Sequence, residues 1–213
     1  MRKIFLSLIG ALAATTALAS PTPPDVVVKQ TSERLQAEIH QRQAEFKKDP
    51  KKLYAYVDEV IVPHFDTRYI AQLILARNWK TATEDQRTRF EKAFKDMLIH
   101  AYADALVEFN GTVKPEWQPL RMAPDATDVT VQSRLIREGG KPPLPIGFAM
   151  RLKDNDWKVY DIIVENLSLV TSFRGQIGSE IKRSSLDALI QRLEAGQTLP
   201  PPKTGDGDAG AKK

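Results

Sequence analysis

The side chains that most often carry out chemistry are sparse in this sequence. It contains no cysteine, which excludes thiol catalysis, thiolate metal sites and disulfide bonds. The three histidines, His40, His64 and His100, lie far apart and lack the spacing of metal ligands. We interpret all three as structural or solvated side chains, and we predict no metal site.

Acidic residues do not supply an acid–base pair either. Asp58 and Glu59 are neighbours on a predicted helix and therefore point in different directions. Asp206 and Asp208 have the spacing of the start of a calcium loop, but the third acidic position and the distal glutamate are missing. The sequence also lacks the glycine-rich phosphate loop, the dinucleotide fingerprint and the Gly-x-Ser-x-Gly turn of hydrolases. We therefore predict that the protein is not an enzyme and uses no cofactor.

Residues 1–19 have the three parts of a secretory signal peptide. Basic Arg2 and Lys3 precede an apolar run at residues 4–12 that is too short to cross a bilayer, and small residues lead to a cleavage position after Ala19. Removing this segment lowers the formal net charge from +4 to +2, which argues against a nucleic-acid binder. No later apolar run is long enough to span a membrane, and no cysteine is available to carry a lipid. We expect a mature protein that is free in an extracytoplasmic space.

Apolar residues repeat every three or four positions through the first half of the mature chain, which predicts amphipathic helices. The clearest helix begins at a capping box, in which Thr83 and Gln86 satisfy each other's backbone donors, and should end at Asn110 and Gly111. The helices predicted here cover residues 25–48, residues 50 to about 62, a short segment opened by Asp66, and residues 84–109.

The pattern then changes to alternation, which predicts strands at residues 112–120, 129–135, 146–152 and 157–165, with a tight turn at residues 154–156. A final helix is predicted at residues 173–195. This order predicts an α+β fold, with a bundle of N-terminal helices plus one C-terminal helix packed on a curved antiparallel sheet of four strands. The domain would cover residues 20–199. We expect residues 200–213 to form a disordered tail, because they are rich in proline and glycine and lack large apolar side chains.

Two long stretches of the chain resemble the MlaC family of periplasmic phospholipid-binding proteins, also known as toluene-tolerance or auxiliary ABC-transporter proteins. The first covers residues 65–106 and the second residues 156–181. The residues that carry the resemblance are Phe65, Asp66, Ile70, Ala71, Trp79, Thr83, Gln86, Phe90, Phe94 and Tyr102 in the first stretch, and Trp157, Lys158, Val159, Asp161, Ser168, Leu169, Phe173 and Arg174 in the second.

The sequence departs from the family pattern in three places. Ala76, Arg77 and Asn78 stand where the family usually has Gly-Arg before the tryptophan, and Phe173 stands where tyrosine is more common. The proline-rich tail is not a family feature. None of these differences removes an apolar side chain from the regions that would form a binding site.

The resemblance implies an internal apolar pocket between the helices and the curved sheet, with phospholipid acyl chains inside and the headgroup at the mouth. It implies a monomeric periplasmic carrier of a Gram-negative bacterium that shuttles phospholipid and maintains outer-membrane asymmetry. Its partners would be an outer-membrane lipoprotein–porin complex and an inner-membrane MCE-type ABC transporter. The residues that we predict to line the pocket are Phe65, Ile70, Ile74, Phe94, Met97, Leu98, Tyr102, Phe148, Met150, Tyr160, Ile162, Val164 and Leu169.

Two alternatives remain open at the level of the sequence. A small secreted hydrolase or isomerase on a cone-shaped α+β scaffold could use Asp66 or Asp161 as a base, although we interpret Asp66 as a helix cap and Asp161 as a structural strand residue. A transporter adaptor that binds only proteins would instead have a tightly packed core. Periodicity cannot separate a packed core from the wall of a cavity.

Overall fold

The structure, a computed structural model, describes residues 20–108, 113–137 and 139–200. The helices are α1 (Pro24–Lys48), α2 (Pro50–Val60), the 3₁₀ helix η1 (Val62–His64), α3 (Thr67–Leu75), α4 (Arg77–Thr81), α5 (Glu84–Glu108), α6 (Leu169–Arg183) and α7 (Leu186–Glu194). The strands are β1 (Val113–Trp117), β2 (Asp128–Arg137), β3 (Leu144–Lys153), β4 (Asp156–Val164) and β5 (Leu167–Ser168). The predicted signal peptide, the end of α5 predicted at Asn110 and Gly111, and the tail beyond Pro200 lie outside the described residues.

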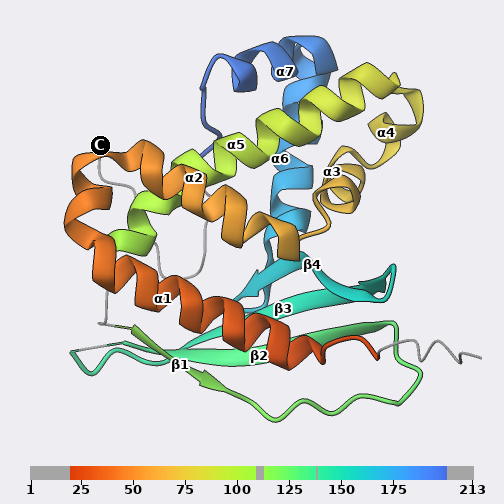
Figure 1. Cartoon of the computed structure of the whole chain (residues 1–213). Coiled ribbons are helices and arrows are strands. Elements are labelled where there is room, and N and C mark those ends of the chain that lie inside the picture. The colour runs from red at the N-terminus through yellow and green to blue at the C-terminus, as the bar shows by residue number, and fades with distance from the viewer. Residues whose placement is uncertain (1–19, 109–112, 138, 201–213) are drawn as a thin grey trace, which may run out of the picture.

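The predicted α+β class is confirmed, because the helices gather on one side of an antiparallel sheet and α1 lies across it (Figure 1). The strands follow one another in the order β1-β2-β3-β4-β5, so the described sheet has five strands rather than four. The additional strand is the two-residue β5, which folds back onto β4 through Glu165 and Asn166. Both residues have positive φ angles, of 50° and 66°, as a two-residue hairpin turn requires.

The predicted turn between β3 and β4 has the same geometry. Asp154 and Asn155 adopt φ angles of 51° and 62°, a conformation that Asn and Asp tolerate better than most residues. Further along this hairpin the register shifts between Ala149 and Met150, because β4 contains one extra residue, Tyr160. This bulge determines which β4 side chains face the helices, since residues directly opposite each other share a face of the sheet.

Most helices begin at a side chain that accepts a hydrogen bond from the first turn. The predicted capping box is present: Thr83 N donates to Gln86 Oε1 at 2.9 Å, and Gln86 N donates to Thr83 Oγ1 at 3.2 Å. Asp66 caps α3 by accepting from Tyr69 N at 3.2 Å. The final helix, predicted as one element, is divided into α6 and α7 because the Ser185 hydroxyl starts a new helix by accepting from the amide of Ala188 at 3.1 Å.

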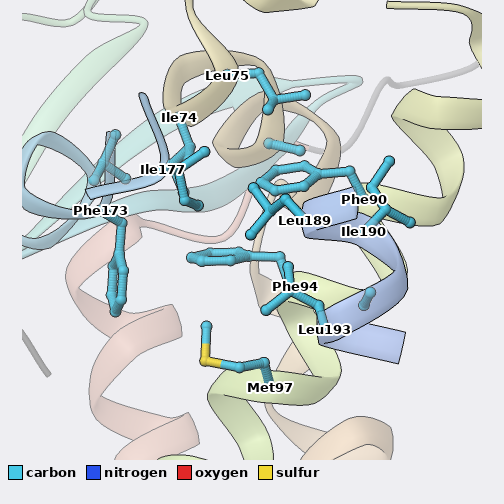
Figure 2. Packing of buried hydrophobic residues seen from close by; sticks show 13 residues of the cluster. Ile74, Leu75, Phe90, Phe94, Met97, Phe173, Ile177, Leu189, Ile190 and Leu193 are labelled. Carbon is cyan, nitrogen blue, oxygen red and sulfur yellow. The ribbon is translucent and has the colours of Figure 1, made fainter. Parts of the chain in front are cut away.

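The buried apolar side chains of the described residues form three separate clusters. The first joins α3, α5, α6 and α7, and Figure 2 shows Phe90, Phe94 and Leu189 at its centre. The second joins α1, α2 and α5 around Phe46 and Leu53. The third joins the start of α1 to the sheet. A small domain usually has one continuous core. The boundaries between these clusters are therefore the places to look for apolar side chains that are not fully packed.

Polar contacts fasten the helices to one another and to the sheet. Arg89 on α5 binds both carboxylate oxygens of Glu194 on α7, at 2.9 and 2.7 Å. At the edge of β4, the backbone amide of Asp66 donates to the carbonyl of Val159 at 3.0 Å, and Phe65 forms an isolated parallel bridge to Val159. Within the described residues, no helix combines the length and apolar character needed to cross a membrane.

One residue between α3 and α4 is under backbone strain. Ala76, directly before Arg77, has φ 48° and ψ −115°. A Cβ atom makes this conformation unfavourable, whereas glycine adopts it readily.

We therefore expect Ala76→Gly to increase the free energy of unfolding by about 1 kcal/mol. Chemical denaturation of the two proteins measures this difference. Ala188→Gly, within α7, is the matched control and should decrease stability by about 1 kcal/mol, because glycine is a poor helix former. A decrease of similar size in both variants would show that Ala76 is not strained.

Candidate apolar binding site between the helices and the sheet

The inner face of the sheet, defined as the face that contacts α1, changes in burial from one end to the other. Val27 and Val28 of α1 pack on Met150 and Val159, which are 0% and 3% exposed. Trp157 is buried at the same end. This half of the inner face is the better packed one, with only Val129 and Leu152 half-buried at its margin.

The other half of the inner face is only partly covered. Phe148 lies opposite Ile162, and Ile146 lies opposite Val164, so all four side chains project from the inner face. Each of the four is half-buried. Large apolar side chains beneath a helical layer are normally excluded from solvent, so this end of the inner face is less completely covered than Met150 and Val159 are.

Helical side chains with the same intermediate burial border this region. Leu98 and Tyr102 lie one turn apart on α5, and Leu169 begins α6 directly after β5; all three pack at the margin of the first cluster. Leu35 of α1 and Leu106 of α5 do the same at the margin of the second cluster. We define the candidate site as the half-buried apolar side chains at the margins of these clusters, on the inner face of the sheet and on the helices.

The environment of the candidate site has low polarity. Burial raises the pKa of the Tyr102 hydroxyl above its usual value, with no contribution from a nearby charge. The half-buried apolar side chains belong to strands and to helices α1, α5 and α6. They are therefore contributed by several segments of the chain rather than by one sequence motif. Such a surface can exclude water from an apolar ligand.

Of the predicted lining residues, Leu98, Tyr102 and Leu169 lie at the margin of the first cluster, Phe148 and Ile162 lie at the margin of the third, and Val164 is half-buried on the inner face. Ile74, Phe94 and Met97 lie within the first cluster, and Figure 2 shows Phe94 and Met97 pointing into the space between the helices. Met150 lies in the packed half of the inner face, and Ile70 and Phe65 pack against the margins of two different clusters.

Tyr160 lies apart from the other predicted lining residues. Its hydroxyl donates to Asp128 Oδ1 at 3.1 Å, and its ring meets Tyr69 edge-on with centroids 5.6 Å apart. Burial, followed by the hydrogen bond to Asp128, raises the pKa of Tyr160 to about 12. The β4 bulge produces this position, since Tyr160 is the residue without a partner on β3.

Several residues at the site were not among the predicted lining. Leu135 and Ile146 belong to strands whose alternation was recognised, and their alignment with Phe148 on one face could have identified them. Leu35 and Leu106 belong to apolar stripes on helices, and the periodicity of a stripe does not show which of its residues stay half-buried.

Neither candidate base of the enzyme alternative is free for catalysis. Asp66 is buried, accepts from Lys153 Nζ at 3.1 Å, and lies 3.6 Å from a guanidinium nitrogen of Arg151. Asp161 lies opposite Ala149, away from the inner face, and accepts from the Ser168 hydroxyl at 2.5 Å and from the amide of Val170 at 3.0 Å. The interpretation of Asp66 as a helix cap is confirmed.

The histidines also have structural surroundings. Burial, and then the charge of Lys158, lowers the pKa of His64. His100 lies against Tyr54 with ring centroids 4.6 Å apart. No group of three or more His, Asp or Glu side chains with the geometry of a metal site occurs in the described part of the chain.

Two surface depressions of about 350 and 260 Å³ lie along α5, on either side of Asp96 and His100. Their charged rims are internally paired: Lys92 contacts Asp96 at 2.6 Å, and Lys95 forms ion pairs with Asp58 and Asp96. Both depressions are therefore less suited to an apolar ligand than the inner face of the sheet.

The fold and the site define a class of α+β protein in which helices cover a sheet around an apolar, partly open interior. The family model described as "MlaC protein" matches residues 29–195, and the chain belongs to the MlaC family. The family expected from the sequence is thus confirmed.

Relatives share most of the chain. The intermembrane phospholipid transport system binding protein MlaC of Haemophilus influenzae is 25% identical over 192 residues, which cover 89% of this chain and 88% of that protein. The toluene tolerance protein ttg2D of Pseudomonas putida is 27% identical over 191 residues, covering 88% and 85%. A solved structure of a phospholipid-binding protein from Ralstonia solanacearum, in complex with a phospholipid, has 29% identity and a TM-score of 0.74, and covers 82% of this chain and 97% of its own.

The difference between the packed and open halves of the inner face can be measured by substitution. We expect Met150→Trp to decrease the free energy of unfolding by about 1–3 kcal/mol, because Met150 has no free space around it. Ile162→Trp should cost less than about 1 kcal/mol, because the larger ring can extend into open volume. Equal losses in denaturation experiments on the two variants would mean that the inner face is packed throughout.

Proposed function

We propose that this protein is a periplasmic carrier that binds a phospholipid by its acyl chains and shuttles it between outer-membrane and inner-membrane complexes. The observation that carries the proposal is the set of large apolar side chains that stay half-buried, Phe148 and Ile162 on the inner face of the sheet and Tyr102 on α5. The Ralstonia relative, whose fold is similar, is described as a complex with a phospholipid.

The energetics of a phospholipid in water explain why such an interior is needed. Two acyl chains contain about 30 methylenes, and each favours an apolar environment by about 0.8 kcal/mol. Exposing both chains to water therefore costs on the order of 20 kcal/mol. A carrier whose interior is as apolar as the bilayer can accept and return the lipid with little net change in free energy, so it needs no cofactor and no bond-making residue.

The lining that we propose is narrower than the set predicted from the sequence. It keeps the residues that are half-buried at the open end of the inner face and on the facing helices, and adds those found only in the structure. These are Leu35, Leu98, Tyr102, Leu106, Leu135, Ile146, Phe148, Ile162, Val164 and Leu169.

The proposed partners are an outer-membrane lipoprotein–porin complex and an inner-membrane MCE-type ABC transporter, and the protein would act as a monomer that maintains outer-membrane lipid asymmetry. The name of the Haemophilus relative, an intermembrane phospholipid transport system binding protein, supports this proposal. Export would use residues 1–19 as a signal peptide cleaved near Ala19. The enzyme alternative has weaker support, because Asp66 and Asp161 both serve as structural acceptors.

If the proposal is correct, the protein purified under mild conditions should carry phospholipid. Native mass spectrometry should show a mass increase of one phospholipid, and organic extraction should recover it in about equimolar amount. Protein that is repeatedly lipid-free, and that takes up no phospholipid from detergent-free donor vesicles, would contradict the proposal.

A charge in the apolar lining should remove this lipid. Phe148→Asp places a carboxylate among acyl chains, where the loss of hydration costs several kcal/mol, so we expect lipid loading to fall at least about tenfold. Ile163→Asp is the matched control, because Ile163 lies opposite Gly147 on the other face of the sheet and should keep its lipid. Circular dichroism spectra that match the spectrum of the parent protein are the check that both variants fold. Full loading of a folded Phe148→Asp protein would remove this residue from the lining.

A further inference from the structure

Large apolar side chains rarely remain exposed on the described surface, and the two that do lie at opposite ends of the sheet. Ile136 is 40% exposed on β2, and Met122 is 43% exposed in the loop between β1 and β2. Ile136 lies directly opposite Lys114 of the edge strand β1, and Arg134 lies two residues earlier on the same face. Lys141 is exposed in the loop that follows β2. We call Lys114, Arg134, Ile136 and Lys141 the hairpin surface.

Contacts across the loop connect the end of β2 to the start of β3. The Arg137 guanidinium donates two hydrogen bonds, of 3.0 and 2.7 Å, to the carbonyl of Pro142. Gly139 and Gly140 have φ angles of 76° and 70°, which other residues would adopt only with strain. Lys141, directly after these glycines, is exposed at this end of the sheet.

The hairpin surface is basic overall. Residues 134–141 contain three basic residues and one acidic residue. Glu116 pairs with Arg134 at 2.9 Å and compensates one of these charges, whereas no ion pair to Lys114 or Lys141 is found among the described residues. An exposed isoleucine among basic side chains is a combination suited to a surface that is both anionic and apolar beneath.

The hairpin surface borders the candidate site. Leu135, between Arg134 and Ile136, points to the inner face and lies opposite Leu144. Both leucines are half-buried at the open end of the apolar region. Three successive residues of β2, Arg134, Leu135 and Ile136, thus alternate between the hairpin surface and the inner face, so whatever contacts this surface lies at the end of the sheet where Leu135 and Leu144 are half-buried.

The edge strand argues against a partner protein that adds a strand here. Gln118 N donates to Gln132 O at 2.9 Å, so the even-numbered residues of β1 bond to β2, and the backbone polar groups of Val113, Pro115 and Trp117 point outward. Pro115 has no amide hydrogen and interrupts this row. A lipid surface does not need a row of free backbone amides in order to bind.

We propose that the hairpin surface docks on the headgroups of an anionic phospholipid bilayer, with Ile136 inserted at the interface. This docking does not depend on whether the protein carries a lipid. Its role, to bring the apolar site close to the membrane for lipid exchange, rests on the proposed function. The bilayer, rather than an acidic protein, is the occupant that both the isoleucine and the interrupted edge strand favour.

Flotation of the secreted protein with vesicles tests this proposal. We expect binding to vesicles of equal parts phosphatidylglycerol and phosphatidylcholine, little binding to phosphatidylcholine alone, and loss of binding in 1 M salt, where charges are screened over about 3 Å. Ile136→Asp and Lys141→Glu should each weaken binding at least about fivefold. Met122→Asp is the matched control, since it removes an equally exposed side chain beside Arg121 at the far end of the sheet, and should bind as the parent protein does.

Each outcome distinguishes the docking from the proposed function. Phospholipid that remains in Ile136→Asp, measured by native mass spectrometry, together with lost vesicle binding, supports the docking surface. If the parent protein carries lipid but does not bind anionic vesicles, the docking proposal is overturned, and an acidic protein becomes the expected occupant of the hairpin surface. A parent protein that binds vesicles but never carries lipid contradicts the carrier proposal while the docking stands. Equal losses in Met122→Asp and Ile136→Asp would also overturn the assignment.

Discussion

The contact between the start of α1 and one half of the inner sheet face is the interaction on which the rest of the structure depends. Val27 and Val28 close over Val131 and Met150 and exclude water there. Because α1 then continues toward α2 and α5, the other half of the same face receives no equivalent cover. The open end of the interior follows from where this one helix leaves the sheet, rather than from any special residue in the site.

Polar contacts make that arrangement possible. The layers of a small domain are usually held together by the apolar side chains between them. Here some of the apolar side chains on the inner face of the sheet are only half-buried and contribute less to this packing. Asp66 connects α3 to β3 through Lys153 and Arg151, and Asp161 connects β4 to the start of α6 through Ser168. These contacts lie at the edge or on the outer side of the sheet, so they position the helices without filling the interior. The two carboxylates that could be mistaken for catalytic groups therefore have a structural function.

Local signals in the sequence predicted the fold well, because capping boxes, tight turns and strand alternation act over a few residues. Thr83 and Gln86 marked the start of α5, and Asp154 and Asn155 marked a hairpin. The site was predicted less completely, because alternation places Phe148 and Met150 on the same face but does not show that α1 covers only one of them. The displacement of Tyr160 by a bulge, and the division of the last helix at Ser185, depend on pairing and capping that periodicity does not reveal.

A carrier must satisfy two opposing requirements, and the division of the inner face accommodates both. A fully packed interior would be stable but could not hold a ligand, and a fully open one would lose the dispersion contacts that stabilise a small domain. Here the packed half around Trp157 supplies stability, while the open half around Ile146 keeps apolar surface available. Since the half-buried apolar surface extends to Leu135 and Leu144, where the loop between β2 and β3 begins, a lipid that left along it would reach the end of the sheet that carries Ile136 and its basic neighbours. Adjacent residues of β2 thus belong to the two surfaces: Leu135 to the half-buried inner face and the exposed Ile136 to the outer face.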